Sequence, residues 1–161
     1  MIPKPHLSVL RKLYAKLESE GVNWVLTGSA SFALQGIPME VHDIDVQTDK
    51  VGAYRIEELF SRYSTKKVSF SSTDNIRSHF GELYIDGVRV EIMGDIQKRL
   101  EYGNWEEPVN LEFHKRFVNV AGMRIPVLSL EYEYQAYLKL GRIEKAEKFK
   151  KGMKHLKCKG R

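Results

Sequence analysis

Cysteine is nearly absent from this chain, since Cys158 is the only one among 161 residues. A single cysteine excludes a disulfide framework within the chain and a zinc site built from several cysteines. Long apolar runs are also missing, and the first residues, Met1 to Pro5, do not start like a secretory signal. The sequence therefore predicts a cytoplasmic protein without a membrane-spanning segment.

The formal net charge of +5 is distributed unevenly along the chain. Residues 142–161 contain nine Lys or Arg and two Glu, a net charge of +7, which leaves −2 for the rest. Such a segment can attract phosphate groups or nucleic acid, because each contact releases counterions. The alternative is a solvated C-terminal helix, because the C-terminal end of a helix favours cations through its dipole.

The apolar residues follow helical and strand periods in turn, without an internal repeat or a linker. Helices are predicted at residues 7–19, 30–35, 52–63, 129–140 and from 142 onward, with Ser29 and Ser129 as N-caps. Strands are predicted at 22–26, 43–48 and 67–71, with hairpins at 79–93, turning at Asp86-Gly87, and at 112–127. This pattern predicts an α/β (α+β) fold with a mixed β-sheet flanked by helices and followed by C-terminal helices. We expect a single domain over residues 1–161, with its core at about 22–142 and a basic tail at 142–161.

Two aspartates, Asp43 and Asp45, are separated by one apolar residue in the predicted strand 43–48. Every second side chain of a strand shares a face, so the two carboxylates would stand side by side. Neighbouring carboxylates repel each other in a protein interior, and a divalent cation is the usual compensation. A purely structural role is also open, with Asp43 in water and Asp45 paired with a Lys or Arg.

A Gly28-Ser29 turn lies thirteen residues before the first aspartate and opens a short predicted helix. The start of a helix after a glycine presents unpaired N–H groups to phosphate. Magnesium prefers carboxylate oxygens and accepts substrate phosphates as its remaining ligands. Glu91, in a later predicted strand, adds a third carboxylate, so that one ion can hold a triphosphate while a second activates a hydroxyl. These residues together predict a nucleoside triphosphate site.

Three short runs, Leu26-Thr27-Gly28-Ser29, Asp43-Ile44-Asp45-Val46 and Val90-Glu91-Ile92, resemble the signature of the nucleotidyltransferase superfamily related to DNA polymerase beta. The segments Gly28 to Gly36 and Val127 to Arg142 resemble the small prokaryotic branch that includes the AbiEii-like and minimal nucleotidyltransferases. The resemblance covers about residues 22–142. It implies the nucleotidyltransferase fold and transfer of a nucleoside monophosphate from a triphosphate, with release of pyrophosphate.

The resemblance also implies roles for individual residues. Gly28 and Ser29 would bind the nucleotide phosphates, and Lys139 would approach the triphosphate from the C-terminal helix. Asp43, Asp45 and Glu91 would be the catalytic residues and the ligands of a two-magnesium site, in which Mn²⁺ can replace Mg²⁺. Two alternatives stay open, namely that Glu91 is a spectator at the end of a hairpin and that Lys139 is a surface lysine of an amphipathic helix.

Three functions are compatible with these features. The first is a magnesium-dependent nucleotidyltransferase that uses a nucleoside triphosphate such as ATP and a hydroxyl of a protein, an RNA or a small molecule. The second is a catalytically inactive nucleotide-binding or antitoxin-like regulatory module, and the third is a nucleic-acid-binding protein that uses the basic tail. The sequence favours the first function, leaves the acceptor and the base open, and is compatible with a homodimer.

Overall fold

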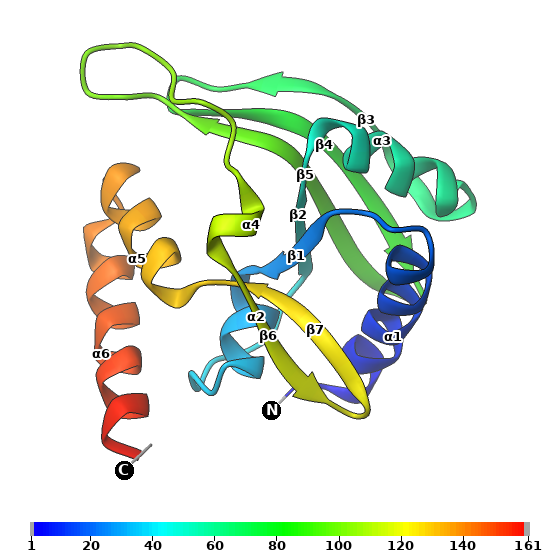
Figure 1. Cartoon of the computed structure of the whole chain (residues 1–161), viewed down its shortest axis with the longest axis horizontal. Coiled ribbons are helices and arrows are strands. Elements are labelled where there is room, and N and C mark those ends of the chain that lie inside the picture. Colours follow the sequence, from blue (N-terminus) through cyan, green and yellow to red (C-terminus); the bar gives the residue numbers. More distant parts are fainter. Residues whose placement is uncertain (1, 160–161) are drawn as a thin grey trace.

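The computed structural model describes residues 2–159, and their side chains up to residue 156. Met1, the last two residues of the predicted basic tail and the side chain of Cys158 lie outside the described part. Seven strands form one mixed sheet in the order β3-β4-β5-β2-β1-β7-β6 (Figure 1). The strands are β1 Trp24–Thr27, β2 Ile44–Thr48, β3 Ser64–Ser72, β4 Ile76–Ile85, β5 Val88–Lys98, β6 Lys115–Val120 and β7 Met123–Leu128. The predicted fold class, a mixed sheet with flanking and C-terminal helices, is confirmed.

Strand β2, which follows directly on Asp43, lies in the middle of the sheet, antiparallel to β1 and parallel to β5. Ile44 and Val46 are completely buried, whereas Asp45 between them is partly exposed. Strand β5 alternates in the same sense, and its Glu91 is the register partner of Asp45. Because neighbouring side chains of a strand point to opposite faces, the sheet has an apolar face and a face that carries acidic residues.

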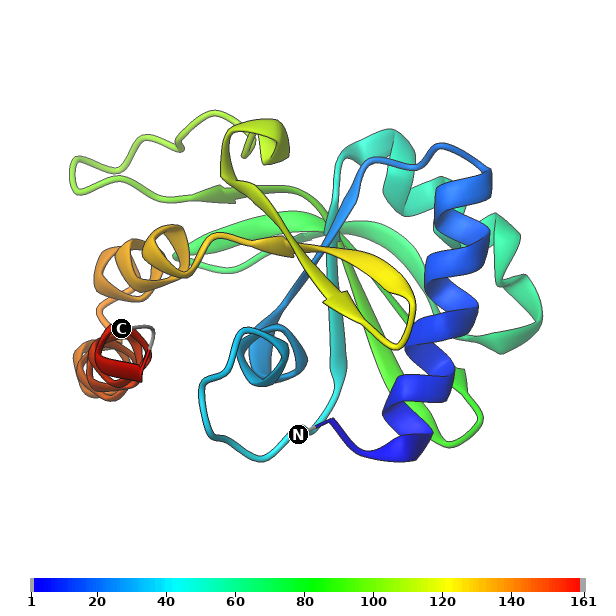
Figure 2. The same ribbon diagram turned by 60° about the horizontal axis from the view of Figure 1, so that its bottom comes forward.

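The apolar face of the sheet is covered by two helices, α1 Lys4–Ser19 and α3 Lys50–Leu59 (Figure 2). Leu10, Leu13 and Leu17 recur at helical spacing along α1, and all three are completely buried. Each buried leucine of this kind contributes roughly 1.5–3 kcal/mol of hydrophobic stabilisation. This main core holds β2 and β5 in place and leaves their acidic face free.

A smaller apolar cluster lies on the other side of the molecule, where α2 Gly28–Leu34 meets α5 Leu130–Lys139 and α6 Ile143–Lys159 (Figure 1). Its centre is Phe32 of α2, whose ring lies 4.7 Å from that of Phe149 and 6.3 Å from that of Tyr137. The cluster holds α5 and α6 against α2 and is separate from the main core.

The predicted turns and helix ends are largely confirmed. Asp86 and Gly87 have φ angles of +49° and +81°, as a two-residue hairpin turn requires. Ser129 caps α5 by accepting a hydrogen bond from the Tyr132 N–H. The helix predicted at 52–63 instead ends at Leu59 and is followed by a separate 3₁₀ turn at Ser61–Tyr63. A short helix α4, Leu111–His114, replaces the first residues of the predicted hairpin 112–127.

The helix predicted at residues 30–35 begins two residues earlier, so the assignment of Ser29 as its N-cap is wrong. The N-cap is Thr27, whose hydroxyl donates to Glu133 and makes no capping hydrogen bond. The Ser29 hydroxyl instead accepts a hydrogen bond of 3.1 Å from the backbone N–H of His42. Gly28 consequently follows β1 directly. Among residues 2–159, no helix is both long enough and apolar enough to cross a membrane.

Candidate active site

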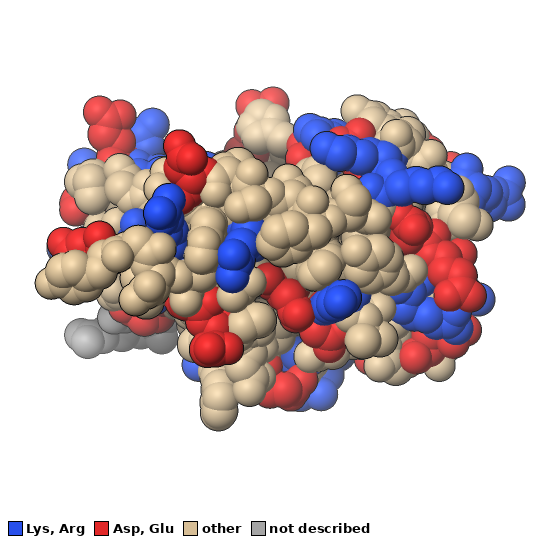
Figure 3. All heavy atoms as spheres, turned by 90° about the horizontal axis from the view of Figure 1, so that it is seen from above, with Lys and Arg blue, Asp and Glu red and all other residues tan. Residues whose placement is uncertain are grey.

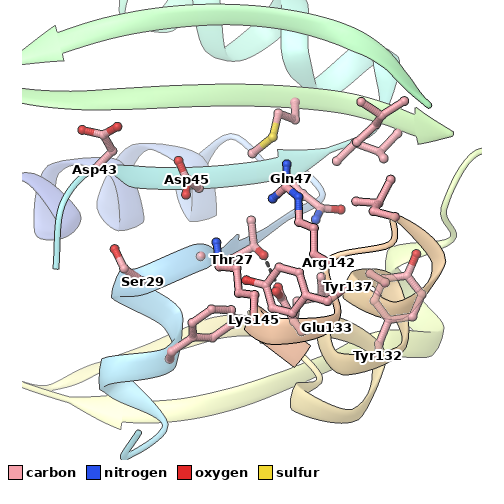
Figure 4. A pocket seen from close by; sticks show the side chains of 18 of the residues that line it. Thr27, Ser29, Asp43, Asp45, Gln47, Tyr132, Glu133, Tyr137, Arg142 and Lys145 are labelled. Atoms are coloured by element: carbon pink, nitrogen blue, oxygen red, sulfur yellow. Dashed lines mark hydrogen bonds between the residues drawn. The ribbon is translucent and has the colours of Figure 1, made fainter. Parts of the chain in front are cut away.

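A cleft of about 510 Å³ lies between the acidic face of the sheet and helices α5 and α6 (Figure 4). One wall comes from β2 and β5 and carries Asp43 and Asp45. The opposite wall comes from α5 and from the start of α6, and the β1–α2 turn forms the floor. The polar lining residues are Thr27, Ser29, Glu40, His42, Asp43, Asp45, Gln47, Lys98, Tyr132, Glu133, Tyr137, Arg142 and Lys145.

The β1–α2 turn and the aspartate strand meet at Gly28. Its φ angle is +73°, and a Cβ atom added there would overlap the carboxylate of Asp45. A glycine is therefore required here for two reasons: the positive φ angle and the close approach of the Asp45 carboxylate. Ser29 lies next to this contact, and its bond to the His42 N–H ties the turn to the segment that leads into β2. The structure thus brings together four of the predicted residues: Gly28, Ser29, Asp43 and Asp45.

Asp45 lies in an unusual electrostatic environment. Burial raises the pKa of its carboxyl group to about 7, and Glu91 and Asp43 add to the rise through charge repulsion. A side-chain hydrogen bond with Glu91 acts in the same direction, and only the positive charge of Arg89 opposes it. The predicted third acid, Glu91, therefore lies directly beside Asp45, on the neighbouring strand.

Arg89 is the cation of this acidic cluster. Its guanidinium lies 2.7 Å from Glu82, 3.0 Å from Glu91 and 3.4 Å from Asp43. Glu82 comes from β4, where it is the register partner of Glu91. Hydrogen bonding to Arg89 lowers the pKa of Glu82. Three carboxylates, those of Asp43, Glu82 and Glu91, thus contact Arg89, and its charge also acts on Asp45. Neither Glu82 nor Arg89 was predicted from the sequence.

The acidic cluster has the donor types that magnesium requires, because its free ligands are carboxylate oxygens. Among the side chains described, those of residues 2–156, however, no three His, Cys, Asp or Glu already converge on one metal position. The raised pKa of Asp45 and the single arginine show that negative charge at the cluster is incompletely compensated. A divalent cation would supply that compensation, so Asp43, Asp45 and Glu91 fit a magnesium site in composition and charge.

Glu133 is a cleft residue that the sequence reading did not identify as functional. It lies in the first turn of α5, is only 6% exposed, and accepts a hydrogen bond from the hydroxyl of Thr27. Burial raises the pKa of Glu133 to about 7, and the negative charge of Asp45 contributes to the rise. From the sequence, Glu133 was recognisable only as an acid that suits the start of a helix. Its position in the cleft depends on how α5 packs against β1.

The basic side of the cleft differs from the prediction. Lys139 does not line the cleft, and its ammonium lies 3.3 Å from Glu106. Arg142, which directly precedes α6, and Lys145, in the first turn of α6, line the cleft instead (Figure 4). Lys98 also lines it, but it is 5% exposed and pairs with Glu106 and the Tyr132 hydroxyl. The structure therefore does not bring Lys139 together with the other predicted residues.

Comparison with known proteins finds close similarity over nearly the whole chain. Residues 9–156 match the model of the family described as aminoglycoside-2''-adenylyltransferase. The crystal structure of a candidate nucleotidyltransferase from Thermotoga maritima is 66% identical in sequence and has a TM-score of 0.86, and the match covers 96% of each chain.

Two solved adenylyltransferases share the fold at low sequence identity. The lincosamide antibiotic adenylyltransferase LnuA, bound to lincomycin, is 17% identical with a TM-score of 0.52, over 82% of this chain and 84% of that one. ANT(2'')-Ia, in complex with adenylyl-2''-tobramycin, is 11% identical with a TM-score of 0.61, over 94% and 89%. A comparison with curated proteins gave no match. None of these findings shows the AbiEii-like branch.

Proposed function

Because the chain belongs to the aminoglycoside-2''-adenylyltransferase family of nucleotidyltransferases, we propose that it transfers AMP from ATP to a hydroxyl group of a small molecule. The observation that carries this proposal is the packing of the Asp45 carboxylate against Gly28, with Asp43 and Glu91 at its side. A phosphate-binding turn and metal-binding carboxylates must lie this close together to act on one triphosphate.

In this proposal the nucleotide phosphates lie between the Gly28-Ser29 turn and the start of α6. Gly28 offers its backbone and Ser29 its hydroxyl, and Arg142 and Lys145 face them across the cleft. Two cations on this wall offset the negative charge of a triphosphate. We therefore propose that Arg142 and Lys145 take the part that the sequence resemblance assigned to Lys139, whose ammonium is engaged with Glu106.

Asp43, Asp45 and Glu91 would hold magnesium, or manganese, in a site for up to two ions. Such ions neutralise charge on the triphosphate and activate an attacking hydroxyl. In the reaction the acceptor oxygen forms a bond to the α-phosphorus, and the bond from that phosphorus to the departing pyrophosphate breaks. We propose that Glu91 takes the proton of the hydroxyl, since its carboxylate is next to Asp45 and is 22% exposed.

A small-molecule acceptor is favoured over a protein or an RNA. Lincomycin and an adenylylated tobramycin are bound by the two adenylyltransferases of the same fold. On the molecular face in Figure 3, Lys and Arg are interspersed with Asp and Glu, whereas nucleic-acid-binding surfaces concentrate one sign of charge. We also propose that residues 1–161 act as one nucleotidyltransferase-like domain.

The proposal is tested by incubating the protein with magnesium, each of the four ribonucleoside triphosphates and a panel of aminoglycosides and lincosamides. We expect a product heavier than the acceptor by one AMP, formed from ATP and detected by mass spectrometry. Asp43→Asn and Asp45→Asn serve as matched controls, because they keep the side-chain size and remove one ionisable carboxyl. Magnesium-dependent ATP binding without any product from the panel would contradict the proposed acceptor class and favour a binding module.

A further inference from the structure

Arg89 reaches carboxylates on two strands and one carboxylate just before a third strand. It extends from β5 and contacts Asp43, which directly precedes β2, Glu82 on β4, and Glu91 on its own strand. Its side chain is 36% exposed, so it lies at the surface of the sheet rather than in the core. Two of its three partners are the acids that we assign to a metal ion.

The contacts of Arg89 are unequal in strength. Both Nε and Nη2 donate to the same oxygen of Glu82, at 2.9 and 2.7 Å. Glu91 receives one contact at 3.0 Å, and Asp43 one at 3.4 Å. Since charge-assisted hydrogen bonds are strongest at short distance, Arg89 is anchored on Glu82 and reaches from there toward the metal-binding acids.

Glu82 is well placed for this anchoring function. Its side chain is 17% exposed, and the Thr65 hydroxyl donates a further hydrogen bond of 3.1 Å to its other oxygen. Glu82 therefore keeps a hydrogen-bond partner and a fixed position whether or not Arg89 contacts Asp43. It is the one acid of the cluster that lies a strand further from β2 than Glu91.

We propose that Arg89 is an internal counter-cation of the metal site. In the metal-free protein it bridges Asp43, Glu82 and Glu91, and when a divalent cation is bound it gives up Asp43 and Glu91 and stays on Glu82. Arg89 thus keeps the ligands together between turnovers at the expense of metal affinity. The inference rests on the proposed function, because it takes Asp43 and Glu91 as metal ligands.

The first test measures Mn²⁺ binding to the full chain by electron paramagnetic resonance, without nucleotide. Arg89→Gln is expected to bind Mn²⁺ about tenfold more tightly than the wild type, since a competing positive charge has left the site. Its melting temperature in EDTA should fall, and saturating Mn²⁺ should restore it. Tighter binding supports the inference, whereas unchanged or weaker binding overturns it.

Arg55→Gln is the matched control. Arg55 has nearly the same exposure, 37%, and also contacts two carboxylates, those of Glu20 and Glu58, at 2.9 and 3.1 Å. Neither carboxylate belongs to the acidic cluster that Arg89 contacts. The variant should therefore leave Mn²⁺ affinity unchanged. A gain equal to that of Arg89→Gln would mean that any lost surface cation increases metal binding, which would overturn the inference.

The second test separates the anchor from the metal ligands. Glu82→Gln should weaken Mn²⁺ binding, because Arg89 then remains on Asp43 and Glu91. In the Arg89→Gln background the same change should weaken binding much less, because only the through-space charge of Glu82 is then lost. A loss in that background as large as in the wild type would show that Glu82 does not act through Arg89 and would overturn the proposed anchoring.

Failure of the inference can be told apart from failure of the proposed function. A wild type that binds Mn²⁺ no better than the Asp43→Asn/Asp45→Asn double variant contradicts the metal-dependent function, and the inference falls with it. A wild type that binds Mn²⁺ through these aspartates, together with an unchanged Arg89→Gln, overturns the inference alone.

Discussion

The two walls of the cleft are built in different ways. The acidic wall consists of central strands in which completely buried residues, such as Ile44, Val46 and Ile92, alternate with the acids. The basic wall is the start of α6, and among the described side chains of this helix only Ala146 and Phe149 are buried. The acids are therefore held by the main core, and the cations by a small separate cluster.

This difference assigns different tasks to the two walls. Catalytic carboxylates need positions fixed to within a fraction of an ångström, which the centre of a sheet provides. A wall that contacts phosphates can tolerate small movements, and elements with few buried contacts open at low free-energy cost. We expect mutations of the acidic wall to affect the chemical step and mutations of the basic wall to affect nucleotide binding.

The largest effect is expected from Asp45→Asn on the acidic wall. Transfer should fall on the order of 10³-fold or more, because a metal ligand is lost. The free energy of unfolding should not fall at pH 8, because a buried charge is removed. Product formation and urea unfolding of the same preparation check both statements. An active variant would refute the role of Asp45, and an unfolded one would show that the carboxylate is structural.

Phe149→Ala should destabilise the packing of the basic wall and leave the packing of the acidic wall unchanged. Removal of a buried phenylalanine costs roughly 3 kcal/mol at the cluster, and we expect α6 to exchange its amide hydrogens faster while β2 and β5 keep their protection. The KM for ATP should rise. Ile92→Ala is the matched change in the main core and should destabilise the whole protein. Equal protection losses throughout the sheet in Phe149→Ala would contradict the separation of the two walls.

Glu133→Gln tests the buried acid between the two walls through the pH dependence of stability. The pKa of Glu133 is raised from 4.5 to about 7, so the wild type loses the stabilising contribution of the protonated form as pH rises through this window. The variant should therefore be about 3 kcal/mol more stable than the wild type at pH 8 and nearly equal to it at pH 4.5, in the absence of metal. Chemical unfolding at the two pH values measures this. A constant difference would show that Glu133 does not titrate as stated.

The smallest effects are expected from Arg142→Gln and Lys145→Gln on the basic wall. Each should raise the KM for ATP about tenfold and leave kcat nearly unchanged, because a phosphate contact is lost in ground state and transition state alike. The effect should shrink at high salt. Lys139→Gln serves as the control and should change neither constant, since Lys139 does not line the cleft. A larger effect for Lys139→Gln would restore the original assignment.

The features that were predictable are those encoded by neighbouring residues. The Asp86-Gly87 turn and the Ser129 cap follow from local backbone and side-chain preferences, and both were predicted correctly. The alternation of Ile44, Asp45 and Val46 was also sufficient to predict a strand with one buried face. In each case the deciding interaction spans only a few positions.

The position of Lys139 could not be predicted from local preferences alone. Glu133 and Lys139 are six residues apart on α5, which at about 100° per residue puts them on different faces of the helix. The sequence could not tell which face turns toward the cleft. Packing of Tyr137 against Phe32 and the hydrogen bond from Thr27 to Glu133 decide this, and both join residues about a hundred positions apart.

The sequence by itself therefore determined the glycine turn, the acidic strand and the class of the fold, because periodicity and turn chemistry are local properties. Only the tertiary structure decided that Glu91 lies beside Asp45, that Arg89 and Glu82 join the acids, and that Arg142 and Lys145 face them. These neighbours come from separate strands and helices, and their arrangement depends on sheet register and helix packing, which are set by burial across the whole chain.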